Sequence, residues 1–113
     1  MADTHEKGLK QYMRSSSKMS KEIPKTMKSF SQLHKDAMEE GSLSTKDKEL
    51  IALGIAISIR CEGCIQAHVK AAVDAGATRA EMHETISVAI LMSGGPGTVY
   101  GAMAHEAIDE FSD

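Results

Sequence analysis

The sequence predicts an all-α fold of about six helices in one domain that spans residues 1–113. Three observations support this prediction. Apolar side chains recur at spacings of three and four residues, which is the period of a helix. Residues typical of helix starts and ends divide the chain into segments of helical length, and no alternating segments are joined by hairpin turn residues. A chain of 113 residues with 42% hydrophobic side chains can bury a modest core, which assembly into an oligomer would enlarge.

The N-terminal region, residues 1–42, is expected to form two polar, amphipathic helices. Pro24 suits the first turn of the second helix, and Gly41 ends it. Each helix has an apolar stripe at helical spacing. The stripe positions are Leu9, Tyr12 and Met13 in the first helix, and Met27, Phe30, Leu33, His34, Ala37 and Met38 in the second.

The core region, residues 43–113, begins with a third helix. Ser44 or Thr45 is expected to cap it, and Asp47 lies in its first turn. The body of this helix, residues 49–59, is almost continuously apolar and lacks a polar face. Its length and its alanine and leucine content favour a helix that is buried on most sides over a buried strand.

Three more helices are predicted after a short break near residues 60–63. The fourth covers residues 64–75 and ends at Gly76. A T-x-x-E capping box, Thr78 to Glu81, opens the fifth. The sixth covers residues 97–111.

A glycine-rich turn, residues 93–96, separates the last two helices. It lacks the lysine and the preceding strand of a phosphate-binding loop, so we interpret it as a turn that lets two helices approach closely. Four methionines sit at core spacing and are interpreted as packing residues rather than a binding groove. They are Met27, Met38, Met82 and Met92.

Composition excludes several classes of function. A net charge of -3 and an aromatic content of 4% argue against a nucleic-acid partner. Proteins that bind nucleic acids usually carry positive charge for the phosphates and aromatic side chains that stack on the bases. The longest apolar run, residues 50–59, is half the length needed to cross a bilayer, so no membrane span is expected. Two cysteines are too few for a secreted, disulfide-rich scaffold, and the chain opens with charged residues. A cytoplasmic location is therefore expected.

The densest cluster of reactive side chains is Cys61, Cys64 and His68. One helical turn separates Cys64 from His68, so the thiol and the imidazole lie on the same helix face. A thiol attacks only as a thiolate, and a helix N-terminus or a neighbouring base can promote its ionisation. A second cysteine three residues away can convert a sulfenic acid to a disulfide.

Glu49 is a carboxylate at the start of the most apolar helix, where an unpartnered charge would be costly. If the third and fourth helices pack antiparallel, Glu49 can orient His68 in a Glu-His-Cys relay. Other interpretations stay open: the cysteines as small buried hydrophobes, Glu49 as a solvated helix-start residue, or a zinc site built from all four side chains. The other histidines have no assigned role. They are His5, His34, His83 and His105.

The stretch from Glu49 to His68, with the spacing E-x11-C-x2-C-x3-H, closely resembles the carboxymuconolactone decarboxylase family, in particular its alkyl hydroperoxidase D-like branch. The resemblance extends to about Ser93. It implies an all-helical subunit that assembles into trimers or hexamers, with the cysteines near a cleft between subunits. It also implies that Cys64 reacts with the peroxide and that Cys61 forms the disulfide with it.

The expected function is thus that of a thiol-dependent peroxidase that reduces a small-molecule hydroperoxide through Cys64 and Cys61. His68 would be the base, Glu49 its orienting partner, and an external dithiol the reductant, with no bound cofactor. Between the cysteines, Glu62 adds a negative charge that disfavours a thiolate, and Gly63 stands where a histidine can occur in this branch. Two alternatives remain: a non-redox enzyme of the decarboxylase type, and a helical oligomeric binding protein with structural thiols.

Overall fold

The computed structural model describes residues 4–112, and within that range it contains six α-helices and no strand. The all-α prediction is therefore confirmed. The helices are α1 (Thr4–Glu22), α2 (Pro24–Met38), α3 (Thr45–Ser58), α4 (Glu62–Asp74), α5 (Arg79–Ser93) and α6 (Gly95–Phe111).

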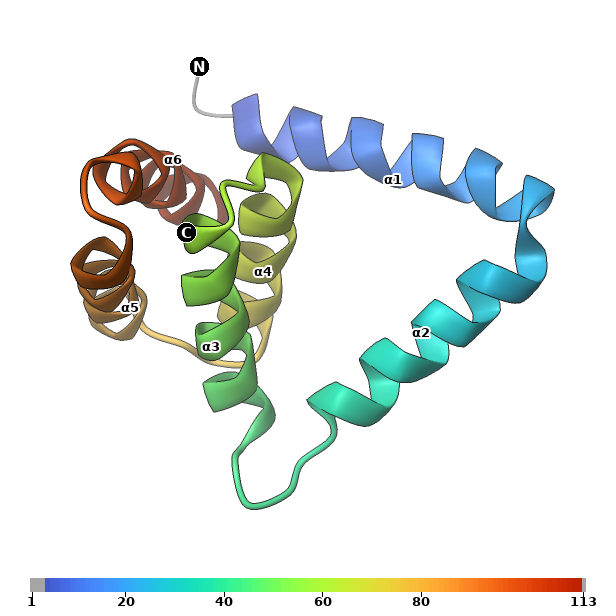
Figure 1. Ribbon diagram of the computed structural model, residues 1–113, viewed down its shortest axis with the longest axis horizontal. Coiled ribbons are helices and arrows are strands. Elements are labelled where there is room, and N and C mark those ends of the chain that lie inside the picture. Colours follow the sequence, from blue (N-terminus) through green and yellow to red (C-terminus); the bar gives the residue numbers. More distant parts are fainter. Residues whose placement is uncertain (1–3, 113) are drawn as a thin grey trace.

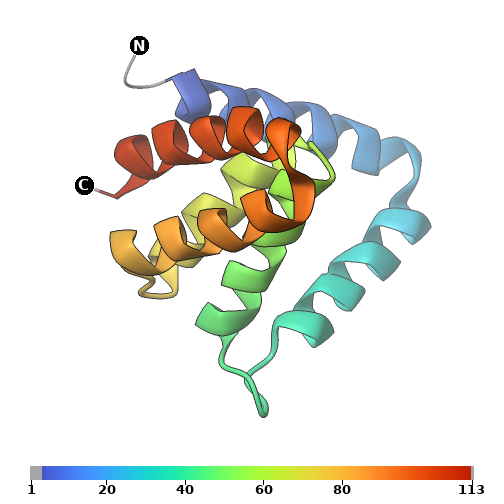
Figure 2. The ribbon, with the colours of Figure 1, turned by 60° about the vertical axis from the view of Figure 1, so that its left-hand side comes forward.

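The core lies among α3, α4, α5 and α6, which pack against one another as two antiparallel pairs (Figure 2). α3 pairs with α4 and α5 with α6, while α3 also packs on α5 and α4 on α6. Fully buried aliphatic side chains from all four helices fill the space between them. The largest are Leu53, Ile57, Ile65, Val69, Met82 and Ile108.

The two N-terminal helices form an arm that projects from this core. α1 packs on α4 and α6 near its start and then runs outward, and α2 returns at an angle toward the start of α3 (Figure 1). α2 has no buried residue. The radius of gyration is 14.2 Å, whereas a compact chain of this length has about 13 Å, which agrees with a projecting arm.

The arm is fixed to the core at its two ends. At the start of α1, the ring of His5 is buried between Gln66 of α4, at 3.1 Å, and Glu106 of α6, also at 3.1 Å. At the end of α2, the hydroxyl of Thr45 donates to the carbonyl of Met38 at 2.7 Å. His5, which had no assigned role in the sequence, is thus an anchor of the arm.

Capping residues set the helix boundaries much as the sequence predicts. The Ser44 hydroxyl accepts from the amide of Asp47 at the start of α3. Thr78 and Glu81 form both hydrogen bonds of the predicted capping box at the start of α5. α4 and α6 each begin two residues earlier than predicted, at Glu62 and Gly95.

Two predictions about burial, those for α3 and for Met92, are wrong for this chain. α3 was expected to be buried on most sides, but Ile51, Ile55 and Ile59 are more than half exposed. The apolar stripe of α2 is largely exposed, with Phe30 at 56%. Met92 was expected to pack in the core but is 76% exposed, whereas Met82 is fully buried as predicted. In each case the apolar pattern is real, but no other part of the described chain covers it.

The glycine-rich turn acts as a tight link between α5 and α6. Gly94 has a φ of 69°, a conformation that glycine adopts without strain. Further along α6, a Cβ at Gly101 would lie 2.9 Å from Cγ2 of Ile86. The absence of a side chain at Gly101 therefore allows α6 to lie close against α5. No helix in the described range combines the length and hydropathy that a membrane span requires.

Candidate functional site

The site is built at the turn between α3 and α4. Arg60 has a φ of 60°, in the left-handed region that non-glycine residues rarely adopt, and it reverses the chain between the two helices. The amides of Arg60 and Cys61 bond to the carbonyls of Ile57 and Ala56 at 3.2 and 3.1 Å. These bonds fix Cys61 at the start of α4.

Cys61 and Cys64 are joined by a disulfide, with their Cα atoms 5.2 Å apart. Cys61 is the N-cap residue of α4, and its sulfur accepts a hydrogen bond from the amide of Cys64 at 3.2 Å. Both residues are half-buried. The helix N-terminus and this amide place partial positive charge beside the Cys61 sulfur.

Glu49 and His68 lie together because α3 and α4 pack antiparallel. Oε1 of Glu49 is 2.7 Å from Nδ1 of His68, and Glu49 is only 4% exposed. Since a carboxylate only accepts, this contact places a proton on Nδ1 and leaves Nε2 as the ring nitrogen available to a neighbouring group. His68 lies one turn after Cys64 on α4, with its side chain 22% exposed.

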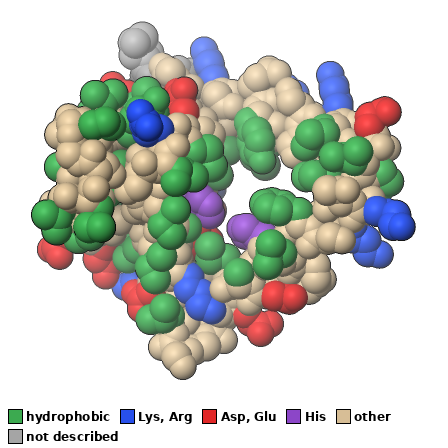
Figure 3. All heavy atoms as spheres, viewed as in Figure 1, with side chains coloured by type: hydrophobic (Ala, Val, Ile, Leu, Met, Phe, Trp, Pro, Cys, Tyr) green, Lys and Arg blue, Asp and Glu red, His purple; other side chains and the backbone are tan. Residues whose placement is uncertain are grey.

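A second histidine reaches the site from the arm. The ring of His34 on α2 is stacked on that of His68, with centroids 6.4 Å apart and planes inclined by 23°. Figure 3 shows an opening between the arm and the core, with histidine side chains at its margin. This contact could not be predicted from the sequence, because His34 lies 34 residues from His68 and no motif links the two.

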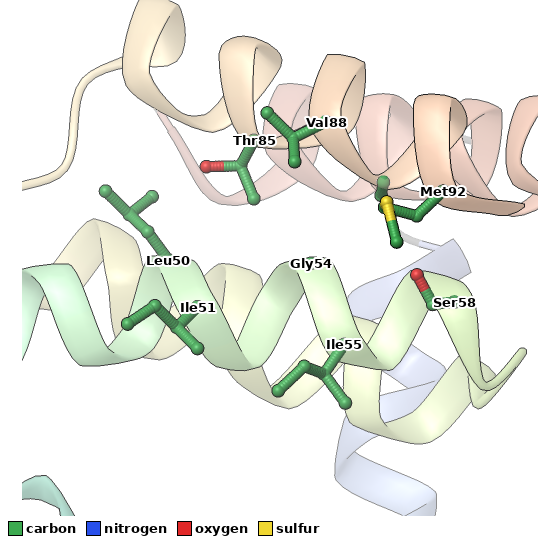
Figure 4. A pocket seen from close by; sticks show the side chains of 9 residues that line it. Leu50, Ile51, Gly54, Ile55, Ser58, Thr85, Val88 and Met92 are labelled. Carbon is green, nitrogen blue, oxygen red and sulfur yellow. The ribbon is translucent and has the colours of Figure 1, made fainter.

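An apolar groove lies on another side of α3, between α3 and α5 (Figure 4). It has a volume of about 560 Å³ and contains none of the four predicted site residues. Ile51, Ile55, Val88 and Met92, all more than half exposed, are among its lining residues. We call this surface the α3–α5 groove.

The cysteine sulfurs are bonded to each other, so the four-ligand zinc alternative does not describe the state seen in the structure. Within residues 4–112, no group of three or more His, Cys, Asp or Glu side chains is arranged to hold a metal ion.

Comparison with known proteins identifies the family. The model of the carboxymuconolactone decarboxylase family matches residues 24–107, which is most of the chain. The chain belongs to the carboxymuconolactone decarboxylase family. The resemblance inferred from the Glu49–His68 motif is therefore confirmed at the level of this family.

Several proteins are similar to this chain in sequence, and one of them has a crystal structure with the same fold. A crystal structure of an apo carboxymuconolactone decarboxylase family protein from Legionella pneumophila is 40% identical, covers 98% of this chain and 99% of its own, and superposes with a TM-score of 0.95. An uncharacterised protein from Cupriavidus necator is 37% identical over 81 residues, 72% of each chain. An uncharacterised cox-locus protein from Paracoccus denitrificans is 36% identical over 72% of this chain and 73% of its own.

Proposed function

We propose that this carboxymuconolactone decarboxylase family member is a thiol-dependent peroxidase of the alkyl hydroperoxidase D-like type. The observation that supports this most directly is the combination of a Cys61–Cys64 disulfide at the start of α4 with a hydrogen-bonded pair of buried Glu49 on α3 and half-buried His68 on α4. A cysteine pair that closes a disulfide can accept two electrons and pass them on. A carboxylate–histidine pair one turn away can accept the proton that a thiol must lose.

In the proposed cycle, the reduced Cys64 gives its proton to Nε2 of His68, and the thiolate attacks the hydroperoxide. A sulfur–oxygen bond forms, the oxygen–oxygen bond breaks, and the alkoxide leaves as an alcohol after taking up the proton. The enzyme is left with a sulfenic acid on Cys64. Glu49 stabilises the imidazolium while the proton resides on His68.

Cys61 then attacks the sulfur of the Cys64 sulfenic acid. The disulfide forms, and the hydroxyl group leaves as water. The amide of Cys64 and the start of α4 favour the thiolate of Cys61, which suits it to this step. An external dithiol then reduces the disulfide by thiol–disulfide exchange, which restores both thiols and leaves the dithiol oxidised. No step requires a bound cofactor.

Site-directed variants test the assignment of the two cysteines. Peroxide consumption with dithiothreitol as reductant should be lost in Cys64→Ser. Cys61→Ser should still be oxidised once at Cys64, and the trapped sulfenic acid should be detectable by dimedone labelling and mass spectrometry. Labelling of Cys61 in Cys64→Ser, with none of Cys64 in Cys61→Ser, would reverse the assignment. Reduced wild-type protein that peroxide does not reoxidise would instead favour structural thiols or a non-redox, decarboxylase-type reaction.

The role of His68 as a base has its own test. His68→Ala should slow oxidation of the reduced protein far more at pH 7 than at pH 9, because at pH 9 thiols ionise without help. An equal loss at both pH values would contradict the general-base role.

We also propose that the subunit acts within a homo-oligomer, a trimer or hexamer, and that the α3–α5 groove is covered by a second copy. Contiguous exposed apolar surface of this kind is typical of subunit contacts. Ile55 in the groove is 55% exposed and Val99 outside it is 57% exposed, which makes them a matched pair. Light scattering should show that Ile55→Glu dissociates the oligomer and that Val99→Glu does not. A monomeric wild-type protein would contradict the proposal.

A further inference from the structure

The arm and the core enclose an opening, here called the arm opening, whose apolar margin is not covered by the described part of the chain (Figure 3). On α2, Phe30 lies one turn before His34, whose ring reaches the thiol site, so the exposed stripe of α2 faces this opening. On α1, Tyr12 and Met13 lie on the same face as the buried Leu9, and both are more than half exposed. Contiguous exposed apolar surface of this kind marks an interaction site.

The arm cannot close this opening by itself. His5 fixes the start of α1 to α4 and α6, and Thr45 fixes the end of α2 to the start of α3. Only Ile23 separates α1 from α2, so the arm consists of two helices held at both ends. Bringing its apolar faces down onto the core would break these anchors. The group that covers these faces must therefore come from another molecule.

α5 presents an apolar ridge that also lacks cover in the described chain. Val88, Leu91 and Met92 lie on one face of α5 at helical spacing, and they are 61%, 79% and 76% exposed. We call these three side chains the α5 ridge. Val88 and Met92 also line the α3–α5 groove (Figure 4). α3 and α4 lie between α5 and the arm (Figure 1), so the α5 ridge of a chain cannot reach its own arm opening.

The arm and the two helices around the α5 ridge carry opposite charges. Residues 4–38 contain eight Lys or Arg and three Asp or Glu, whereas residues 79–111, which form α5 and α6, contain one and five. The Lys and Arg side chains of the arm project from its outer side (Figure 3). Charges in physiological salt act over about 8–10 Å, which is close to the diameter of a helix. The arm of one copy is therefore attracted to α5 and α6 of another, while the inner face of the arm makes the apolar contact.

We propose that the arm opening of one copy receives the α5 ridge of a second copy. The proposal rests on the homo-oligomer proposed above, and it names the segment that covers the α3–α5 groove, which is the arm. Each copy has one opening and one ridge, so the contact runs head to tail and closes when a few copies form a ring, in keeping with a trimer or a pair of trimers. Because His34 lies at the opening, α5 of the second copy completes the surroundings of the thiol site.

Phe30→Glu tests the arm side of this contact. α2 has no buried residue, so the substitution should leave the fold intact, which circular dichroism checks. It places a charge in an apolar contact and should raise the subunit dissociation constant by about tenfold or more in light scattering and sedimentation measurements. Gln32→Glu adds a negative charge on the opposite, exposed face of α2 and should leave the dissociation constant unchanged.

The outcomes separate this inference from the homo-oligomer itself. If Ile55→Glu dissociates the oligomer and Phe30→Glu does not, another segment covers the α3–α5 groove, and the inference is overturned while the homo-oligomer stands. A monomeric wild-type protein would overturn both. Neither result bears on the chemistry of Cys61 and Cys64, which the peroxide oxidation experiments test separately.

Chemical cross-linking tests which surfaces meet. Leu33→Cys and Leu91→Cys are introduced into separate chains that carry different tags, each with Cys61→Ser and Cys64→Ser, and the two chains are co-expressed. A short bismaleimide should join one tag to the other, because α2 of one copy lies against α5 of the next. Val99→Cys on α6, with a similar exposure of 57% in the wild type, should not be joined to Leu33→Cys. An oligomer in which Leu33→Cys is joined only to itself, or equally to both partners, would contradict the proposal.

Discussion

Replacing Glu49 by Gln tests the electrostatic part of the proposed peroxidase mechanism. The substitution preserves the shape of the side chain and an acceptor oxygen for Nδ1 of His68, but it removes the charge. Glu49 is only 4% exposed and lies 2.7 Å from that nitrogen, so solvent cannot replace the lost carboxylate efficiently. We therefore expect the imidazolium form of His68, which accompanies the Cys64 thiolate, to be destabilised.

The size of the effect follows from the type of hydrogen bond that is lost. Hydrogen bonds with a charged partner contribute about 1.5–3 kcal/mol, whereas neutral ones contribute about 0.5–1.5 kcal/mol. The difference, about 1–2 kcal/mol, corresponds to a five- to thirtyfold slower reaction, since each 1.36 kcal/mol is about tenfold. The rate to measure is single-turnover oxidation of the reduced protein by peroxide at pH 7, by rapid quench.

A control for the loss of one carboxylate is available at the end of α4. Asp74 pairs with Lys70 at 2.9 Å on the exposed surface and lies outside the proposed relay. Asp74→Asn should therefore leave the oxidation rate unchanged. A rate for Glu49→Gln within twofold of the wild type, with its helical circular dichroism intact, would refute the relay.

Three further predictions concern stability, pH and the arm. Gly101→Ala should lower the free energy of unfolding by about 1–3 kcal/mol in urea titrations, because its Cβ would meet Ile86 at 2.9 Å. Gly54→Ala should not lower it, because its Cβ would meet Thr85 at 3.5 Å, an ordinary contact distance. Equal destabilisation by the two substitutions would contradict the packing argument. The backbone amide of Thr78 and then Lys46 hold the pKa of Glu81 below its ordinary value of 4.5. The stability that Glu81 supplies is thus present above that value and lost as the pH falls through the lower folded pKa, so the difference between wild type and Glu81→Gln should shrink from pH 7 to pH 3; a pH-independent difference would argue against it. His34→Ala should slow peroxide turnover about two- to tenfold, which corresponds to the energy of one stacked pair of aromatic rings. His34→Phe should restore turnover. If Phe does not restore it, the role of His34 is not stacking.

Local signals in the sequence predicted most of the secondary structure. Ser44 and the Thr78–Glu81 box mark helix starts because their side chains satisfy amides within three residues, which needs no tertiary information. The start of α4 was missed because the cap is Cys61, whose sulfur is an uncommon acceptor. The break near Arg60 was predicted, but its left-handed conformation was not, because that conformation is usually found at glycine or asparagine.

Contacts that join distant segments were harder to predict. The contact between Glu49 and His68 could be anticipated, because the two residues lie on consecutive antiparallel helices. The rise per residue then shows how far each lies from the turn that joins them. The stack of His34 on His68 and the contact of His83 with His105 depend on how whole helices cross. Apolar periodicity indicates which face of a helix requires cover, but it does not say whether the same chain provides it, and α2 and α3 show the difference.

The way in which the arm is attached to the core determines the position of His34 at the proposed site. α2 carries His34 to the site, yet none of its own residues is buried, and Phe30 and Leu33 are exposed. The position of His34 over His68 is therefore set by the anchors at the two ends of the arm, His5 and Thr45, and not by packing along α2. Helices without buried contacts open at low free-energy cost. A second copy that covered the exposed face of α2 as well as the α3–α5 groove would hold His34 in place, so a fully ordered site is expected to depend on assembly.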